Sequence, residues 1–153
     1  TFLALHGAEG ENGKLQALLD LNAIPYTGSG YLGSAIAMDK AMAKRVLEAQ
    51  GVLTPTWREF EYSDSDIERL TGELAVPCAV KTVKGGSSIG VVLPETKAQL
   101  REALRSVLRY GSRVVTEEKI YGRELTVPVL DGKALSLQAL LQGNGQREAP
   151  KGP

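Results

Sequence analysis

The stretch KTVKGGSSIG, residues 81–90, places a glycine-rich loop between two apolar runs of the chain. Glycine lets backbone N–H groups approach phosphate oxygens, serine hydroxyls add further donors, and lysine ammonium groups supply the opposite charge. By composition alone, an ordinary glycine-rich hairpin is about as good an interpretation. A P-loop is excluded, because no Gly-Lys-Ser/Thr sequence opens a helix here. The stretch therefore predicts either an anion-binding loop or a plain turn.

Segments of helical and strand pattern surround this loop on both sides. Apolar residues recur every three to four positions in the helical segments, and shorter apolar runs lie between them. Gly51 is placed to end the second helix, and Asp131-Gly132 predicts a tight hairpin turn. Strands are predicted over 1–5, 76–81, 89–93, 114–119, 124–130 and 133–141, a loop over 6–13, an extended edge segment over 52–62, and helices over 14–21, 34–50, 63–74 and 97–110. The pattern as a whole predicts an α/β (α+β) fold.

The composition is that of a globular chain without strong charge bias. Of the 153 residues 42% are apolar, and 18 basic residues balance 18 acidic ones without any run of Lys or Arg. The sequence therefore has no cluster of basic residues of the kind that binds nucleic acid or a membrane surface. The expected partner is a small ligand. The single cysteine, Cys78, lies in an apolar run and is interpreted as a core residue rather than a reactive thiol. With no disulfide framework, signal peptide or long apolar segment, we expect a cytoplasmic protein.

A second glycine-rich segment, GSGYLG at 28–33, matches the dinucleotide-binding pattern G-x-G-x-x-G and precedes a helical pattern. The residues before it, 24–27, are too few and contain a proline, so they do not form the buried strand that this pattern requires. We interpret the segment as a turn that leads into a helix.

Charged residues gather in the segment EEKIYGRE, 117–124, which joins two predicted strands. Its carboxylates are either solvated charges at a sheet edge or acceptors for the amino group and hydroxyls of a nucleotide. His6 follows the first predicted strand, a common place for ligand contacts, although a lone histidine is more often a structural hydrogen-bonding group. Asp39-Lys40, inside a predicted helix, is by itself an ordinary solvated pair.

Taken in order, five segments resemble the motifs of the D-alanine–D-alanine ligases, a family of the ATP-grasp superfamily. The resemblance covers residues 1 to about 135. It implies the end of a Rossmann-like preATP-grasp domain over 1–36 and a central ATP-grasp nucleotide-binding subdomain with an antiparallel sheet and helices over 37–141. For 142–153, the near absence of apolar residues predicts an irregular tail. The five segments are LHG (5–7) with GENG (10–13), PYTGSG (25–30), AMDK (37–40), VK (80–81) with GSSIG (86–90), and EE (117–118) with GRELTV (122–127).

The resemblance also implies a role for individual residues. The family's phosphate contacts fall on Lys40, Lys81, Gly85, Gly86 and Ser88, with residues 85–90 as the lid loop. Its adenine contacts fall on Glu117, Glu118 and the backbone of Ile120, and its ribose contact falls on Glu124. The first D-alanine site falls on His6 and on Ser87, which also belongs to the catalytic network.

The implied reaction is attack of a D-alanine carboxylate on the γ-phosphate of ATP, followed by attack of a second D-alanine amine on the acylphosphate. Mg²⁺ is implied as well, but we expect its ligands in a C-terminal ATP-grasp domain beyond this chain and assign no metal ligand. The family is often homodimeric. Thr82 and Val83 depart from the family pattern before the loop. We expect this chain alone to be inactive.

The leading interpretation is therefore a D-alanine–D-alanine ligase. The alternatives are a non-catalytic ATP-binding fragment and another ATP-grasp carboxylate–amine ligase.

Overall fold

The structure is a computed structural model that describes residues 1–5, 7–86, 88–135 and 138–140. Contacts divide the chain into two units, Thr1–Lys119 and Ile120–Pro153, and each is described by itself. None of the helices in the described residues has both the length and the apolarity that crossing a membrane requires.

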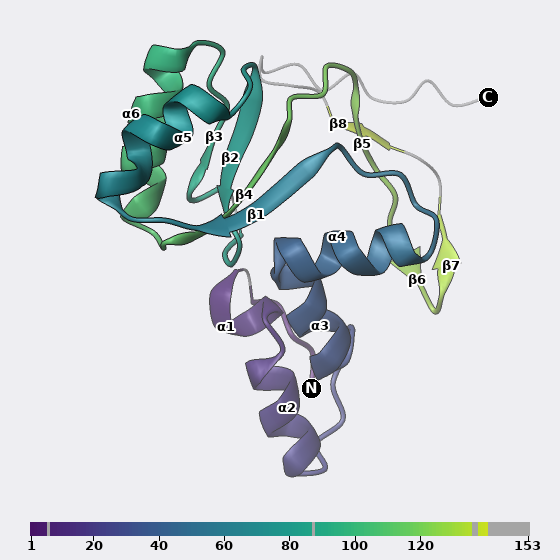
Figure 1. Cartoon of the computed structure of the whole chain (residues 1–153). Coiled ribbons are helices and arrows are strands. Elements are labelled where there is room, and N and C mark those ends of the chain that lie inside the picture. The colour runs from purple at the N-terminus through teal and green to yellow at the C-terminus, as the bar shows by residue number, and fades with distance from the viewer. Residues whose placement is uncertain (6, 87, 136–137, 141–153) are drawn as a thin grey trace, which may run out of the picture. The chain divides into compact units, whose positions relative to one another are not determined.

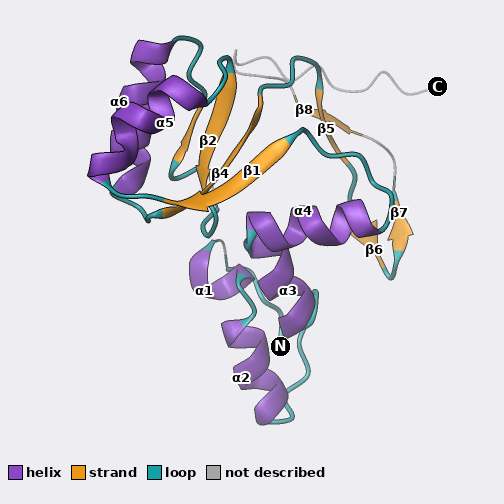
Figure 2. Cartoon of the chain, viewed as in Figure 1, coloured by secondary structure: helices purple, strands orange, loops and turns teal. Residues whose placement is uncertain are grey.

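The first unit carries all the described helices and the larger sheet (Figures 1 and 2). Its helices are α1 (Ala8–Glu11), α2 (Lys14–Leu21), α3 (Tyr31–Met38), α4 (Lys40–Ala49), the 3₁₀ turn Asp64–Asp66, α5 (Ile67–Glu73) and α6 (Lys97–Leu108). Its strands are β1 (Trp57–Glu61), β2 (Cys78–Thr82), β3 (Val91–Val92) and β4 (Arg113–Glu118).

These four strands form one antiparallel sheet in the order β1-β4-β2-β3. Lys81 on β2 pairs with Val115 on β4, and Ala79 pairs with Glu117. Because side chains alternate between the two faces of a sheet, Lys81 and Glu117 point to the same face as diagonal neighbours. The predicted combination of helices with an antiparallel sheet is confirmed.

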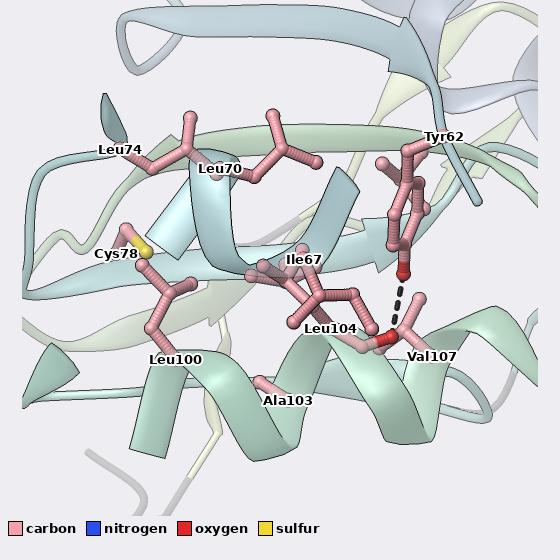
Figure 3. Close-up of a cluster of buried hydrophobic side chains, with 11 residues drawn as sticks. Tyr62, Ile67, Leu70, Leu74, Cys78, Leu100, Ala103, Leu104 and Val107 are labelled. Atoms are coloured by element: carbon pink, nitrogen blue, oxygen red, sulfur yellow. Dashed lines mark hydrogen bonds between the residues drawn. The ribbon is translucent and has the colours of Figure 1, made fainter. Parts of the chain in front are cut away.

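Helices α5 and α6 cover one face of this sheet and build the main core with it (Figures 1 and 3). The hydroxyl of Tyr62 donates a 2.6 Å hydrogen bond to the backbone oxygen of Leu104, and burial raises the pKa of Tyr62 to about 12. Cys78 is buried in the same core, and burial raises the pKa of its thiol, as expected for a packing residue rather than a nucleophile. The buried members of the core are Tyr62, Ile67, Leu70, Leu74, Cys78, Val80, Leu100, Ala103, Leu104, Val107 and Val114.

Helix α4 packs on the opposite face of the sheet. Ala41 is fully buried there in a small cluster with Val83 and Val115, and Trp57 of β1 packs against it. Small residues at this contact let the helix approach the strands closely, so the polar side chains of α4 are brought down onto the sheet. This second face holds Lys81 and Glu117.

The single helix predicted over 34–50 is wrong, because α3 and α4 meet at Asp39. The Asp39 backbone is extended, with φ −101° and ψ 103°, and forms an isolated bridge with Lys84. The next residue, Lys40, donates its backbone N–H to the oxygen of Val83 over 2.9 Å. The Asp39 carboxylate caps α4 by accepting from the Met42 N–H at 3.0 Å. A tertiary contact with the chain after β2 therefore interrupts a locally helical pattern.

The other predicted elements of the first unit are either confirmed or differ from the structure in their details. Helix α2 has the predicted bounds, Gly51 follows α4 with a positive φ of 73°, and the helix predicted over 63–74 begins with a capping box at Ser63 followed by a 3₁₀ turn. The segment 1–5 is not a strand: Thr27 N–H donates to Thr1 oxygen, but no ladder forms in the described residues. The predicted loop after it contains the short helix α1.

The described strands of the second unit are β5 (Glu124–Thr126), β6 (Val129–Leu130), β7 (Lys133–Ala134) and β8 (Gln138–Leu140). Strand β6 pairs with β7 and β5 pairs with β8, both antiparallel. Asp131 and Gly132 both have positive φ, 49° and 71°, so the predicted hairpin turn is confirmed. The strand predicted over 124–130 is split, since Pro128 has no N–H to give to a ladder.

Candidate functional site

Lys81 and Glu117 meet on the face of the sheet that α4 covers. The Lys81 ammonium donates to Oε1 of Glu117, and the Lys44 ammonium from α4 lies 2.7 Å from Oε2 of the same carboxylate. The Glu117 side chain is only 8% exposed. Each carboxylate oxygen therefore faces one lysine in a largely dry environment, where charge-assisted hydrogen bonds are strongest.

The environment keeps Glu117 ionised. Burial acts to raise its pKa, but the hydrogen bonds and charges of Lys44 and Lys81 act in the opposite direction and prevail, so the pKa of Glu117 is lowered. Two ammonium groups then face one carboxylate, and the cluster carries an excess of positive charge.

Lys40, the first residue of α4, joins this positive region. Its ammonium donates a 2.9 Å hydrogen bond to the backbone oxygen of Gly85, at the start of the glycine-rich loop. Burial and then the charge of Lys81 lower the pKa of Lys40, while Asp39 and Glu117 oppose the shift only in part. The lowered pKa means that the surroundings disfavour the charged form of Lys40. A bound anion would stabilise that charged form, so the site suits an anionic ligand.

The base of the glycine-rich loop is closed by the hairpin of β2 and β3. Thr82 donates its N–H to Gly90 oxygen at 2.9 Å and its hydroxyl to Lys84 oxygen at 2.8 Å. Gly90 has φ +69°, and a Cβ there would lie 2.8 Å from the Thr82 hydroxyl oxygen, so only glycine suits this position. Thr82, which departs from the family pattern, is thus buried at the base of the loop and bonded to it.

A separate ion-pair network lies on the same face, around Glu59 of β1. Arg45 of α4 and Arg113 of β4 each pair with the Glu59 carboxylate. Arg113 also lies 3.4 Å from the Asp39 carboxylate. Two adjacent cations of α4 therefore pair with different carboxylates: Arg45 pairs with Glu59 and Lys44 pairs with Glu117.

Three of the predicted ligand-binding side chains, Lys40, Lys81 and Glu117, come together beside Gly85 in the structure. Gly86 and Ser88 lie in the same loop, and a Cβ on Gly86 would lie 3.3 Å from the Met38 methyl carbon. The Glu118 carboxylate accepts instead from the Thr56 N–H at 3.2 Å. The structure therefore places Lys40 and Lys81 together at the start of the loop, and their contact with a ligand stays a prediction.

Four of the predicted residues are not among the described residues of the first unit. His6 and Ser87 are outside the described residues. Ile120 and Glu124 belong to the second unit, so the site is built from the first unit alone. The roles of all four stay predictions.

Lys44 was not among the predicted site residues. Its spacing carried a signal, because a residue four positions after Lys40 lies on the same face of a helix. The Lys44 ammonium also lies 5.8 Å from the ring centroid of Trp57, whose indole N–H donates to Glu48 at 2.6 Å. Trp57 is the only tryptophan in the sequence, so it is a built-in optical reporter next to the site.

The described residues do not suit a magnesium ion. Across the ranges that the structure describes, no three His, Cys, Asp or Glu side chains come together as a metal site. Three carboxylates of this region, Asp39, Glu59 and Glu117, are each paired with Lys or Arg, and Glu11 is the further carboxylate beside Gly86. Mg²⁺ prefers unpaired oxygen ligands, so no chemistry is assigned to a metal here.

Comparison with known proteins shows which family this chain belongs to. The family model described as "D-ala D-ala ligase C-terminus" matches residues 46–146. A D-alanine--D-alanine ligase from Gloeobacter violaceus is 43% identical over 145 residues, which make up 93% of this chain and 48% of the relative. The chain thus spans about half the length of the curated relatives it matches.

Solved structures agree with that match. The crystal structure of a D-alanine--D-alanine ligase from Bacillus anthracis is 38% identical with a TM-score of 0.77, covering 90% of this chain and 45% of that one. A structure of the Bacillus anthracis ligase complexed with ATP is 36% identical with a TM-score of 0.75, covering 90% and 46%. The antiparallel sheet and its helices therefore follow the fold of these enzymes.

Proposed function

The chain belongs to the D-alanine–D-alanine ligase family and has its ATP-grasp fold, and on this premise we propose that it binds ATP as part of a ligase that joins two D-alanines. The observation that carries this proposal is the cluster of three lysines beside the glycine-rich loop, in which Lys44 and Lys81 share the Glu117 carboxylate and Lys40 bonds to the Gly85 oxygen. An excess of partly buried positive charge at a loop rich in backbone donors suits a polyphosphate.

In this proposal, the chain contributes positioning and charge neutralisation. Lys40 and Lys81 bind phosphate oxygens, and Lys40 exchanges its hydrogen bond to Gly85 for one to ATP. A D-alanine carboxylate attacks the γ-phosphate and ADP leaves. The amine of the second D-alanine then attacks the acylphosphate, and phosphate leaves as the amide forms. Developing negative charge on the transferred group is what fixed ammonium groups and loop N–H donors stabilise.

The remaining roles are proposed on the family resemblance. We assign adenine contacts to Glu117, Glu118 and the Ile120 backbone, the ribose contact to Glu124, and further phosphate contacts to Gly85, Gly86 and Ser88. His6 and Ser87 are assigned to the first D-alanine, with Ser87 in the catalytic network. The division at 1–36, 37–141 and 142–153 is proposed in the same way. A cytoplasmic location and assembly as a homodimer are part of the same proposal.

Calorimetric titration with ATP tests the proposal. We expect saturable binding at one site per chain and weaker binding of AMP, because the lysines and the loop suit the β- and γ-phosphates. The absence of ATP binding by the folded chain would contradict the proposal. ADP release that depends on D-alanine distinguishes the ligase from a binding-only fragment, and dependence on a different amino acid indicates another ATP-grasp ligase. From this chain alone we expect binding without that release, since its described residues offer no magnesium site.

A further inference from the structure

Glu117 is shared between two lysines that differ in exposure. The Lys44 side chain is 12% exposed and that of Lys81 is 25% exposed. Lys44 is therefore the more buried of the two lysines, and Lys81 is the more accessible to solvent. Lys81 is thus the better placed of the two to exchange its partner for a ligand.

The charge count shows why the second lysine matters. A carboxylate bonded to Lys81 alone would form a neutral pair and would compete with a phosphate for that ammonium. With Lys44 also bonded, two positive charges share one negative charge. Lys81 then keeps its attraction for an anion while Glu117 still fixes its direction.

The position of Lys44 is determined by the packing of α4. Ala41, one turn earlier, is buried against the sheet, and the Trp57 ring lies 5.8 Å from the Lys44 ammonium. Cation–π attraction to Trp57 and the 2.7 Å pair with Glu117 both act on the same ammonium. The neighbouring cation on the helix, Arg45, goes to Glu59 instead.

We propose that Lys44 is a positioning residue for the nucleotide site: it holds the Glu117 carboxylate and leaves Lys81 free to bind the phosphates of ATP. This inference rests on the proposed ATP-binding function. It assigns Lys44 an indirect action through Glu117 and no contact with the nucleotide.

The test is a double-mutant cycle on ATP affinity, measured by calorimetry with the whole chain. Lys44→Met keeps the aliphatic stem and removes the charge, and we expect the Kd for ATP to rise about tenfold, the size of one charge-assisted hydrogen bond. Lys44→Arg keeps the charge and is expected to restore affinity to within about threefold of the wild type. In a Glu117→Gln background, Lys44→Met is expected to change the Kd less than about twofold, because the group it acts through is already neutral.

Arg45→Met is the matched control. It removes the same charge from the adjacent position of α4, and its guanidinium lies 5.4 Å from the same Trp57 ring, but it pairs with Glu59. We expect its Kd for ATP to stay within about twofold of the wild type. Circular dichroism and thermal unfolding establish that each variant is folded.

The outcomes separate the inference from the function on which it rests. If the folded wild type does not bind ATP, the proposed function fails. If the wild type binds and folded Lys44→Met binds equally well, the positioning role is wrong. If Lys44→Met weakens binding as much in the Glu117→Gln background as in the wild type, Lys44 acts directly on the ligand and the inference is also overturned.

Discussion

The ammonium group of Lys40 donates a 2.9 Å hydrogen bond to the backbone oxygen of Gly85, 45 residues further along the chain. This contact joins the start of α4 to the start of the glycine-rich loop. It places a cation at the loop without committing it to a carboxylate, so an anion can take over the bond.

Lys40→Ala should weaken ATP binding. The substitution removes one charge-assisted contact of about 1.5–3 kcal/mol, which corresponds to roughly 10- to 150-fold in Kd. Arg105→Ala is the control, because Arg105 is an exposed cation of α6, on the other face of the sheet, and pairs with Glu102. Titration calorimetry measures both variants. Equal affinities for Lys40→Ala and the wild type would remove Lys40 from the site.

ATP binding should take up protons at alkaline pH through Lys40. Burial and the charge of Lys81 lower the pKa of Lys40 in the free protein from the ordinary value of 10.5, and a bound phosphate opposes that shift. Between the lower free-state pKa and the higher bound-state pKa, the complex holds more protons, so affinity should fall as the pH rises through this window. Titrations in two buffers with different ionisation enthalpies measure the uptake. Uptake that persists unchanged in Lys40→Met would assign it to another group.

Asp39→Ala should destabilise the fold by about 0.5–2 kcal/mol, because α4 loses its N-cap hydrogen bond from Met42 N–H. Asp39→Asn keeps an equally good cap but loses the charge that faces Arg113 at 3.4 Å. Urea unfolding should therefore show a larger loss for alanine than for asparagine. Equal losses of unfolding free energy in the two variants would mean that Asp39 stabilises the fold through its pair with Arg113 and not through the cap.

Tyr62→Phe should cost about 1 kcal/mol in unfolding free energy, since a buried hydrogen bond to Leu104 oxygen is lost. Tyr110→Phe, at an exposed position, should be close to neutral. The wild type should also lose stability between pH 10, where an ordinary tyrosine ionises, and about pH 12, where Tyr62 does so when folded. The unfolded chain releases its proton first across that range, so rising pH favours unfolding. The same loss in Tyr62→Phe would show that Tyr62 is not its source.

Much of the fold was predictable, since local patterns and long-range packing agree over most of the first unit. Helix α2 and the Asp131-Gly132 turn follow from periodicity and from turn chemistry. The break at Asp39 was not predictable in this way, because it depends on pairing with Lys84, which lies far along the chain. Local periodicity there favours one continuous helix, and the tertiary contact prevails.

The site was predictable in part for a related reason. Alternation along β2 and β4 places Lys81 and Glu117 on one face, but which cation a carboxylate selects depends on how a helix packs over the sheet. The family resemblance implied ligand contacts for Lys81 and Glu117, and the structure pairs the two side chains with each other. The pairing of Lys44 with Glu117 depends on the packing of α4 on that face, so it could not be predicted from the sequence.

The most direct test of the account is calorimetric titration of ATP into the wild-type chain and into Lys81→Ala. We predict one saturable site in the wild type and a Kd higher by roughly 10- to 150-fold in the variant, because a charge-assisted phosphate contact is lost. Equal affinity in the two folded proteins would contradict the account and place any nucleotide elsewhere.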